Sequence, residues 1–406
     1  MRISTSMMFN GGTLNMQQLQ SGLYQLQNQM TAQKRILTPS DDPVAAAQAV
    51  VVSQNQAVNS MYINNQGNAG SQLALLDGQL GGITDLLTSV KEQVVTASST
   101  GIGNAGRAAI SANIKQRYNE LMGLANSTDA MGQHLFSGFR GDTQPFAATG
   151  TPGSRTVSYS GDDGKRQLQV ASGRLMDVSE SGSDLFMRIP QGNGSFMFSA
   201  GTTNTGTGSI GASSTISGYD GSAYQLTFTA ANAYTLVTTT NGVPTSTSGT
   251  YTAGNQIVLG GAGQQIQISI SGAPAVGDTF TVAPSSNQDI FKTLDDMISA
   301  LDSNVSASPA STAAFMNQMT NVSANLDQAF NKMLNARASV GTRQVELDSL
   351  TTVGNNVDLQ YSTDLKNLQD FDYIKASSDL ASQKLALEAA QLAFKQTSAL
   401  SLFSIL

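Results

Sequence analysis

Apolar residues recur at alternating spacings of three and four near both ends of this 406-residue chain, and the repeat stops in the middle. Near the N-terminus, in residues 16–37, the repeat is carried by Met16, Leu19, Leu23, Leu26, Met30 and Leu37, with Gln33 as its one polar position. These spacings place the side chains along one face of an α-helix, the pattern of a coiled-coil seam. Because such a helix needs a partner to cover its seam, the sequence predicts paired helices.

Three further segments have a one-sided apolar pattern. A second seam runs through Leu73, Leu76, Leu80, Ile83, Leu87, Val90, Val94 and Ala97, on a helix that we expect to begin at Pro43. A third runs through Phe315, Met319, Val322, Leu326, Ala329, Met333, Ala336 and Val340, and continues to Leu347 and Leu350. The last segment has a broader stripe that includes Ile374, Leu380, Leu385, Leu387, Leu392 and Phe394. We expect these helices to pair in a long antiparallel rod or coiled coil formed by both chain ends.

The middle of the chain, residues 145–285, loses this repeat and is rich in Gly, Ser and Thr. Short runs such as AYQLTFTAANAYTLVTTT (223–240), GNQIVLGG (254–261) and QQIQISISG (264–272) alternate in the way that strands and turns do. In TVSYSGDDGKRQLQV (156–170), two alternating runs flank Asp163-Gly164, which predicts a hairpin. A one-sided helix returns in DIFKTLDDMISAL (289–301).

These patterns predict a mainly α chain with an inserted β domain. The predicted domains are a terminal coiled coil (1–40 with 365–406), a helical rod (41–144 with 286–364) and a β-rich outer domain (145–285). The terminal seam buries too little apolar surface to offset the conformational entropy of two long segments. We therefore expect the terminal coiled coil to be disordered in the monomer and to order when neighbouring copies cover it.

The composition excludes several classes of function. Only 12% of residues are charged, the net charge is −7, and no basic cluster is present, which argues against nucleic-acid binding. The chain has no cysteine and one histidine, so thiolate chemistry and imidazole metal sites are excluded. No segment approaches the length of a membrane span, and the N-terminus lacks the apolar core of a cleaved secretory signal.

The acid pair in RILTPSDDPVAAAQAV (35–50) has a catalytic and a structural interpretation. Adjacent residues on a helix lie about 100° apart, which separates the two carboxylates. The structural interpretation uses the whole stretch Pro39, Ser40, Asp41, Asp42 and Pro43. Pro39 ends the first helix after Leu37. Ser40, Asp41 or Asp42 then caps the next helix, and Pro43 lies in its first turn. We predict a helix cap and domain boundary.

Two other motifs do not indicate an enzyme. GIGNAG (101–106) has the spelling of a dinucleotide-binding loop, but it follows a heptad run instead of a strand, which favours a loop between helices. His134 has no catalytic partner beside it in the sequence. We therefore predict no catalytic residues, no cofactor and no metal site.

Several segments resemble the flagellin family. These are the opening MRIST, the stretch ILTPSDDPVAAAQAV and the closing LQDFDYIKASSDLASQKLALEAAQLAFKQTSALSLF. YSGDDGKRQLQV, SGSDLFMRIP and DIFKTLDDMISAL are similar to segments of family members from the junction between hook and filament. Filament subunits usually carry an SAKDD type of sequence where this chain has LTPSDDP, which favours a junction member. Residues 199–285 match no characteristic family segment.

The resemblance implies a structural, extracellular protein that leaves the cell unfolded through the flagellar type III apparatus, assisted by an export chaperone. It would form a ring between the first hook-associated protein and the flagellin filament, as a mechanical adaptor. The 16–37 and 374–402 seams would be inner-layer contacts between copies. The alternatives are a flagellin filament subunit, a surface adhesin with a glycan-binding β domain, and a polysaccharide-cleaving enzyme displayed on a stalk.

Overall fold

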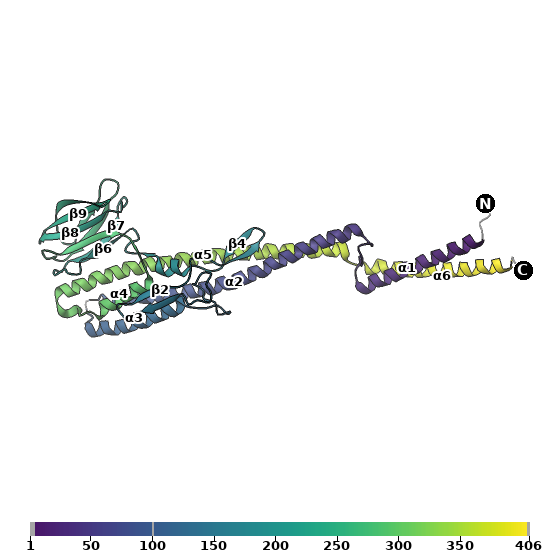
Figure 1. Cartoon of the computed structure of the whole chain (residues 1–406), viewed down its shortest axis with the longest axis horizontal. Helices are drawn as coiled ribbons and strands as arrows, with labels where there is room; N and C mark the ends of the chain where they lie inside the picture. Colours follow the sequence, from purple (N-terminus) through teal and green to yellow (C-terminus); the bar gives the residue numbers. More distant parts are fainter. Residues whose placement is uncertain (1–4, 100, 404–406) are drawn as a thin grey trace. The chain divides into compact units, whose positions relative to one another are not determined.

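A computed structural model describes residues 5–99 and 101–403 of the chain (Figure 1). Its helices are α1 (Thr5–Ala32), α2 (Pro43–Ala97), α3 (Asn104–Ala125), α4 (Ile290–Asp302), α5 (Pro309–Gln369) and α6 (Tyr373–Phe403), with two short helical turns at Ser183–Met187 and Val305–Ala307. The strands are β1 (Phe146–Thr149), β2 (Thr156–Tyr159), β3 (Gln167–Ala171), β4 (Arg174–Asp177), β5 (Ile189–Pro190), β6 (Phe196–Ala200), β7 (Ser209–Thr215), β8 (Ala223–Ala230), β9 (Ala233–Thr240), β10 (Val243–Thr250), β11 (Gln256–Leu259), β12 (Ile266–Ser271), β13 (Thr279–Pro284) and β14 (Asn287–Gln288). The predicted class, mainly α with a β-rich insertion, is confirmed.

The chain divides into two compact units. The terminal unit comprises Met1–Asn64 and Ser349–Leu406, and the central unit comprises Asn65–Asp348. The three domains expected from the sequence stay a prediction. Residues 1–4 and 404–406 of the predicted terminal coiled coil, with most of the MRIST opening, lie outside the described residues.

Antiparallel helix pairs build the terminal unit. In Figure 1, α1 and α6 lie side by side. The start of α2 pairs with the end of α5 through polar contacts, in which the amide of Gln56 donates to Ser362 Oγ at 3.0 Å and that of Asn59 donates to the carbonyl of Gly354 at 2.8 Å. Polar groups at such helix contacts favour one register over its neighbours.

Apolar seams hold the helices of the central unit. All eight residues of the second predicted seam are buried on α2, and α2 begins at Pro43 as expected. On α5, most of the third seam is buried, while Ala336 and Leu350 are half-buried. The ion pairs Lys91–Asp327 and Arg337–Asp77 flank this contact at 2.6 and 3.0 Å. Helix α4 buries the predicted face of DIFKTLDDMISAL, and the carboxylate of Asp289 caps it by accepting the N–H of Lys292.

The first helix ends earlier than the sequence pattern predicted. It stops at Ala32 instead of Leu37, because Gln33 adopts a left-handed conformation with φ of 51°. The N–H of Lys34 then donates to the carbonyl of Gln29 at 3.2 Å, as in a Schellman ending. Leu37 consequently lies outside the helix and is partly exposed. The expectation that Pro39 ends the helix was therefore wrong.

Most of the insertion forms a two-sheet β structure. One sheet has the strand order β10-β9-β8-β13-β6 and the other has the order β11-β12-β7. The inward side chains of both sheets share one core, which includes Leu226, Phe228, Ile268 and Phe280. The strands predicted in AYQLTFTAANAYTLVTTT, GNQIVLGG and QQIQISISG are all present.

The hairpin predicted over 156–170 is absent. Strand β2 pairs with β1, and β3 pairs with β4. The intervening segment is not a tight turn, because Asp162 Oδ1 accepts the N–H of Phe139 at 2.9 Å as well as that of Gly164 at 2.8 Å. The hairpin turn lies instead at Ser172-Gly173, where Gly173 has a φ of 72°.

Two asparagines of α5 attach the β region to the helix. The side chain of Asn317 accepts the N–H of Ile210 at 2.7 Å and donates to the carbonyl of Gly208 at 3.0 Å. Two turns later, Asn325 accepts the N–H of Gly192 at 2.8 Å. Both side chains are buried, so these amides satisfy backbone groups that water does not reach.

Candidate assembly surface

The contact between α1 and α6 is an open seam. On α1, the side chains of Met16, Leu19, Leu23, Leu26 and Met30 are all half-buried. On α6, the half-buried Leu380, Leu387 and Phe394 recur at spacing seven. The rings of Phe9 and Phe394 lie 4.6 Å apart, and a Cβ at Gly12 would lie 2.9 Å from the Phe394 ring. Among the described side chains of the two helices, Ala376 is the one that is fully buried.

The stripe on α6 divides into two faces. Ile374 is 86% exposed and Leu385 is 68% exposed, and Leu392 projects on the same side. Five positions along a helix correspond to about 140° around its axis, which separates Leu385 from Leu380. The single broad stripe expected from the sequence is therefore two stripes, and one of them faces away from α1. On α1, Met7, Leu14 and Tyr24 are similarly exposed.

The segment between α1 and α2 lies against the segment between α5 and α6. Lys34 and Asp370 form an antiparallel bridge, and the N–H of Arg35 donates to the carbonyl of Gln369 at 2.8 Å. The guanidinium of Arg35 also reaches the carbonyl of Leu368 at 2.8 Å. Hydrogen bonds thus join the segment that links α1 to α2 with the segment that links α5 to α6.

The two adjacent aspartates serve different segments. Asp42 Oδ1 accepts the N–H of Ala45 at 3.0 Å, which makes Asp42 the N-cap of α2, and its Oδ2 lies 3.2 Å from Arg35 Nη1. Asp41 Oδ2 accepts the N–H groups of Leu37 and Thr38 at 2.9 and 2.8 Å, and its Oδ1 accepts from the amide of Gln25. All four carboxylate oxygens are engaged in structural contacts.

Hydrogen bonds lower the pKa of both acids. The backbone N–H groups of Thr38 and Leu37 hold the pKa of Asp41 below its ordinary value of 3.8. The N–H of Ala45, with help from Arg35, does the same for Asp42. General acid catalysis needs a carboxyl that stays protonated near working pH, so these shifts run against that role. Ser40 Oγ lies 2.8 Å from Thr38 Oγ1, within the same turn.

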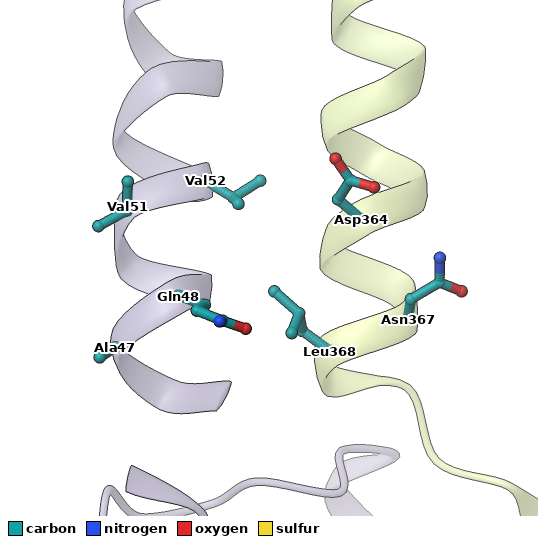
Figure 2. Close-up of a pocket in the computed structure, with 7 residues that line it drawn as sticks. All are labelled: Ala47, Gln48, Val51, Val52, Asp364, Asn367 and Leu368. Atoms are coloured by element: carbon teal, nitrogen blue, oxygen red, sulfur yellow. The ribbon is translucent and has the colours of Figure 1, made fainter. Parts of the chain in front are cut away.

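A shallow groove of about 570 Å³ lies between α2 and α5 in the terminal unit. Ala47, Gln48, Val51 and Val52 line it from α2, and Asp364, Asn367 and Leu368 line it from α5 (Figure 2). Figure 2 shows Val52 and Leu368 pointing into the space between the two helices. Apart from Asp364, its lining is uncharged.

A heptad stripe that the sequence analysis missed runs along α2 at the edge of this groove, which Val51 also lines. Val44, Val51 and Val58 follow at spacing seven and are exposed. The sequence contained the signal, since residues 43–76 include no charged side chain.

The remaining candidate motifs lie in loops and at a helix start. GIGNAG spans the end of the α2–α3 loop and the first turn of α3, as expected. His134 Nδ1 lies 2.8 Å from the carbonyl oxygen of Asn126, which holds the ring in a loop. Among the residues that the structure describes, none of the helices contains an apolar stretch of the length that a bilayer requires.

Comparison with known proteins connects these features to a family. Residues 3–140 match the model of the bacterial flagellin N-terminal helical region. Over 406 residues, the chain is 26% identical to flagellar hook-associated protein 3 of Salmonella typhimurium strain LT2, covering 100% of this chain and 99% of that protein. The hook-associated protein 3 of Escherichia coli strain K12 is also 26% identical, over 405 residues.

Solved structures agree with the sequence matches. A crystal structure of Xanthomonas campestris FlgL has a TM-score of 0.70 and 31% identity, over 78% of this chain and 99% of that one. The chain belongs to the hook-associated protein 3 (FlgL) family. The flagellar junction protein FlgL of Legionella pneumophila has a TM-score of 0.68 and 27% identity, over 80% of this chain and 100% of that one.

Membership of the FlgL family makes this chain an extracellular structural component of the bacterial flagellum and not an enzyme. The resemblance found in the sequence to junction members is therefore confirmed. The full-length FlgL matches also decide against the filament-subunit and stalked-enzyme alternatives.

Proposed function

We propose that this FlgL family member forms the ring that joins the hook to the flagellin filament. The first hook-associated protein lies on one side of the ring and flagellin on the other, and copies of this chain contact one another within it. The ring acts as a mechanical adaptor between a flexible and a stiffer polymer. An export chaperone binds the chain before secretion. The full-length similarity to hook-associated protein 3 carries this proposal.

The exposed faces of the terminal unit support contacts between copies. Each chain exposes Ile374, Leu385 and Leu392 on α6 and Val44, Val51 and Val58 on α2. Exposed apolar stripes of this kind mark interaction surfaces, and heptad spacing suits a helical partner. The half-buried seam of α1 and α6 adds further proposed contacts, at Met16, Leu19, Leu23, Leu26, Met30, Leu380, Leu387 and Phe394. Leu37, which lies beyond the end of α1, is the remaining proposed contact.

The boundary stretch from Pro39 to Pro43 has its own proposed role. Asp41 and Asp42 fix the turn between α1 and α2, and Arg35 ties that turn to the end of α5. The turn therefore sets the direction in which α1 and α6 leave the α2–α5 pair. We propose that it separates the helices that order on assembly from those that fold within the subunit.

Electron microscopy of flagella from cells that lack this protein tests the proposed function. We expect hooks without filaments and flagellin released into the medium, because a junction subunit is needed before flagellin can polymerise. Expression of the wild-type chain in the same cells should restore filaments. Normal filaments in the deletion strain would contradict the proposal.

A further inference from the structure

A buried arginine lies in the first turn of α3, and no acidic side chain of the described residues pairs with it. Arg107 is 6% exposed, and its guanidinium carbon lies 4.8 Å from the centre of the Phe315 ring. Its Nε has no hydrogen-bond partner among the described residues. Arginine stays charged in proteins, and a buried charge is costly unless it is paired. The stacking on Phe315 offsets only part of this cost, so the guanidinium is suited to receive an anion.

The backbone adds positive potential at the same place. Helix α3 has 22 residues, and its N-cap is Gly103, which has no side chain to accept hydrogen bonds from the first turn. The unsatisfied N–H groups of a helix start attract anions, as does the helix dipole. Arg107 and the helix start therefore favour the same kind of ligand.

A cavity of about 380 Å³ opens at this position. Arg107 lines it together with Gly101 and Gly103, Ser306 lines it from the segment between α4 and α5, and Thr312 lines it from the first turn of α5. Arg107 is the one charged residue among the described residues that line the cavity. The hydroxyls of Ser306 and Thr312 already donate to Asn104 Oδ1 at 3.0 Å and to the carbonyl of Val305 at 3.1 Å. The lining thus offers an anion the guanidinium of Arg107 and the backbone of Gly101 and Gly103, with no carboxylate to repel it.

We propose that this cavity binds a small tetrahedral oxyanion, phosphate or sulfate, between the guanidinium of Arg107 and the backbone N–H of Gly103, the N-cap of α3. The two glycines of GIGNAG that line the cavity keep the helix start open to such a ligand. The bound anion ties α3 to the connection between α4 and α5.

Isothermal titration of the full chain with sodium phosphate, at ionic strength matched with sodium chloride, tests the site. We expect saturable binding of one phosphate per chain and a phosphate-dependent rise in Tm. Arg107→Gln should weaken binding by about tenfold or more, the loss expected for a charge-assisted hydrogen bond. Arg117→Gln is the matched control, because Arg117 lies on the same helix but pairs with Glu120 at 2.8 Å. It should bind phosphate as the wild type does.

Gly103 provides a second test that does not disturb the buried arginine. Its φ of −77° suits any residue, and a Cβ there would meet nothing within 4 Å. Gly103→Asp places a carboxylate at the helix start, where it competes with the free anion, so phosphate binding should be lost in a folded chain. Gly103→Ala adds no charge and should keep it. The proposal is overturned by a wild type that shows no saturable binding, by wild-type affinity in a folded Arg107→Gln, or by equal affinity in the two Gly103 variants.

Discussion

Asp42 joins two functions in one side chain, since it caps α2 and pairs with Arg35. Its neighbour Asp41 accepts N–H groups of the preceding turn. In both acids, the ionised form receives the hydrogen bonds, which is why each pKa lies below 3.8. The turn between α1 and α2 therefore depends on two charged carboxylates.

This dependence predicts an acid-sensitive boundary. Because the folded pKa of Asp42 is lowered, its stabilisation is present above the unfolded value of 3.8 and is lost as the pH falls through the folded pKa. Asp42→Asn should lower Tm near neutral pH. It should also make Tm fall less than in the wild type when the pH is lowered below 3.8. Circular dichroism melts at a series of pH values measure the Tm near neutral pH and its decrease on acidification. Asp379→Asn, at an exposed site on α6, is the control and should keep the wild-type profile. Identical profiles for Asp42→Asn and the wild type would contradict the prediction.

Asn317 carries the attachment of the β region to α5. Asn317→Ala leaves the buried N–H of Ile210 and the carbonyl of Gly208 without their partner. We expect the free energy of unfolding to fall by about 1–3 kcal/mol, the cost of unsatisfied buried polar groups. Urea unfolding of the full chain measures it. Asn335→Ala, at an exposed position on the same helix, controls for helix propensity and should not destabilise. An equal response of the two variants would argue against this attachment.

At the scale of elements, α6 is a helix with two apolar faces. One face packs half-buried against α1, and the opposite face is exposed. The outer stripe of α2 repeats this arrangement beside the groove in Figure 2. We propose that in both helices one seam serves the helix's own chain and the other a helix of a neighbouring copy.

Paired substitutions separate the two faces of α6. The double variant Leu385→Ser with Leu392→Ser should keep the wild-type circular dichroism and melting curve, because both side chains are exposed in the single chain. The same variant should fail to restore filaments in cells that lack the protein, because the face for neighbouring copies is lost. Leu380→Ser with Leu387→Ser removes the half-buried face that packs against α1, so it should leave the disordered ends of the monomer unchanged and prevent α1 and α6 from pairing on assembly. Full filaments with the outer-face variant would remove this face from the assembly surface.

At the scale of the whole molecule, burial differs sharply between the units. The central unit buries continuous apolar seams and the β core. The described side chains of α1 and α6 include one fully buried residue, Ala376. Helices with so little buried surface gain little stability from packing. The expected disorder of the chain ends in the monomer stays a prediction that solution experiments decide.

Limited proteolysis of the purified monomer provides that experiment. We expect about 30 to 40 residues to be removed from each end first, because segments with little burial are preferred cleavage sites. Mass spectrometry of the products locates the cuts, and the central unit should survive as the resistant fragment. Assembled flagella serve as the comparison, in which the ends should be protected. Monomer ends as resistant as the central unit would show that α1 and α6 fold without neighbours.

Local patterns in the sequence determined most of the architecture. The spacing of Leu73 to Ala97 and the alternation in 223–240 are properties of short segments. They therefore predicted the helix and the strands without knowledge of tertiary contacts. The proline and acids of SDDP likewise indicated where α2 begins. The composition excluded whole classes of site in the same way.

Only the tertiary structure decided which partners these segments take. It placed the end of α1 at Gln33, paired β2 with β1 instead of β3, and divided the stripe of α6 into two faces. It also placed Arg107 beside an open helix start, next to a phenylalanine more than 200 residues away. Apart from the Schellman ending at Gln33, these outcomes depend on contacts that lie outside any one short segment. A short segment has the same periodicity whichever partner covers it, so its sequence cannot name that partner.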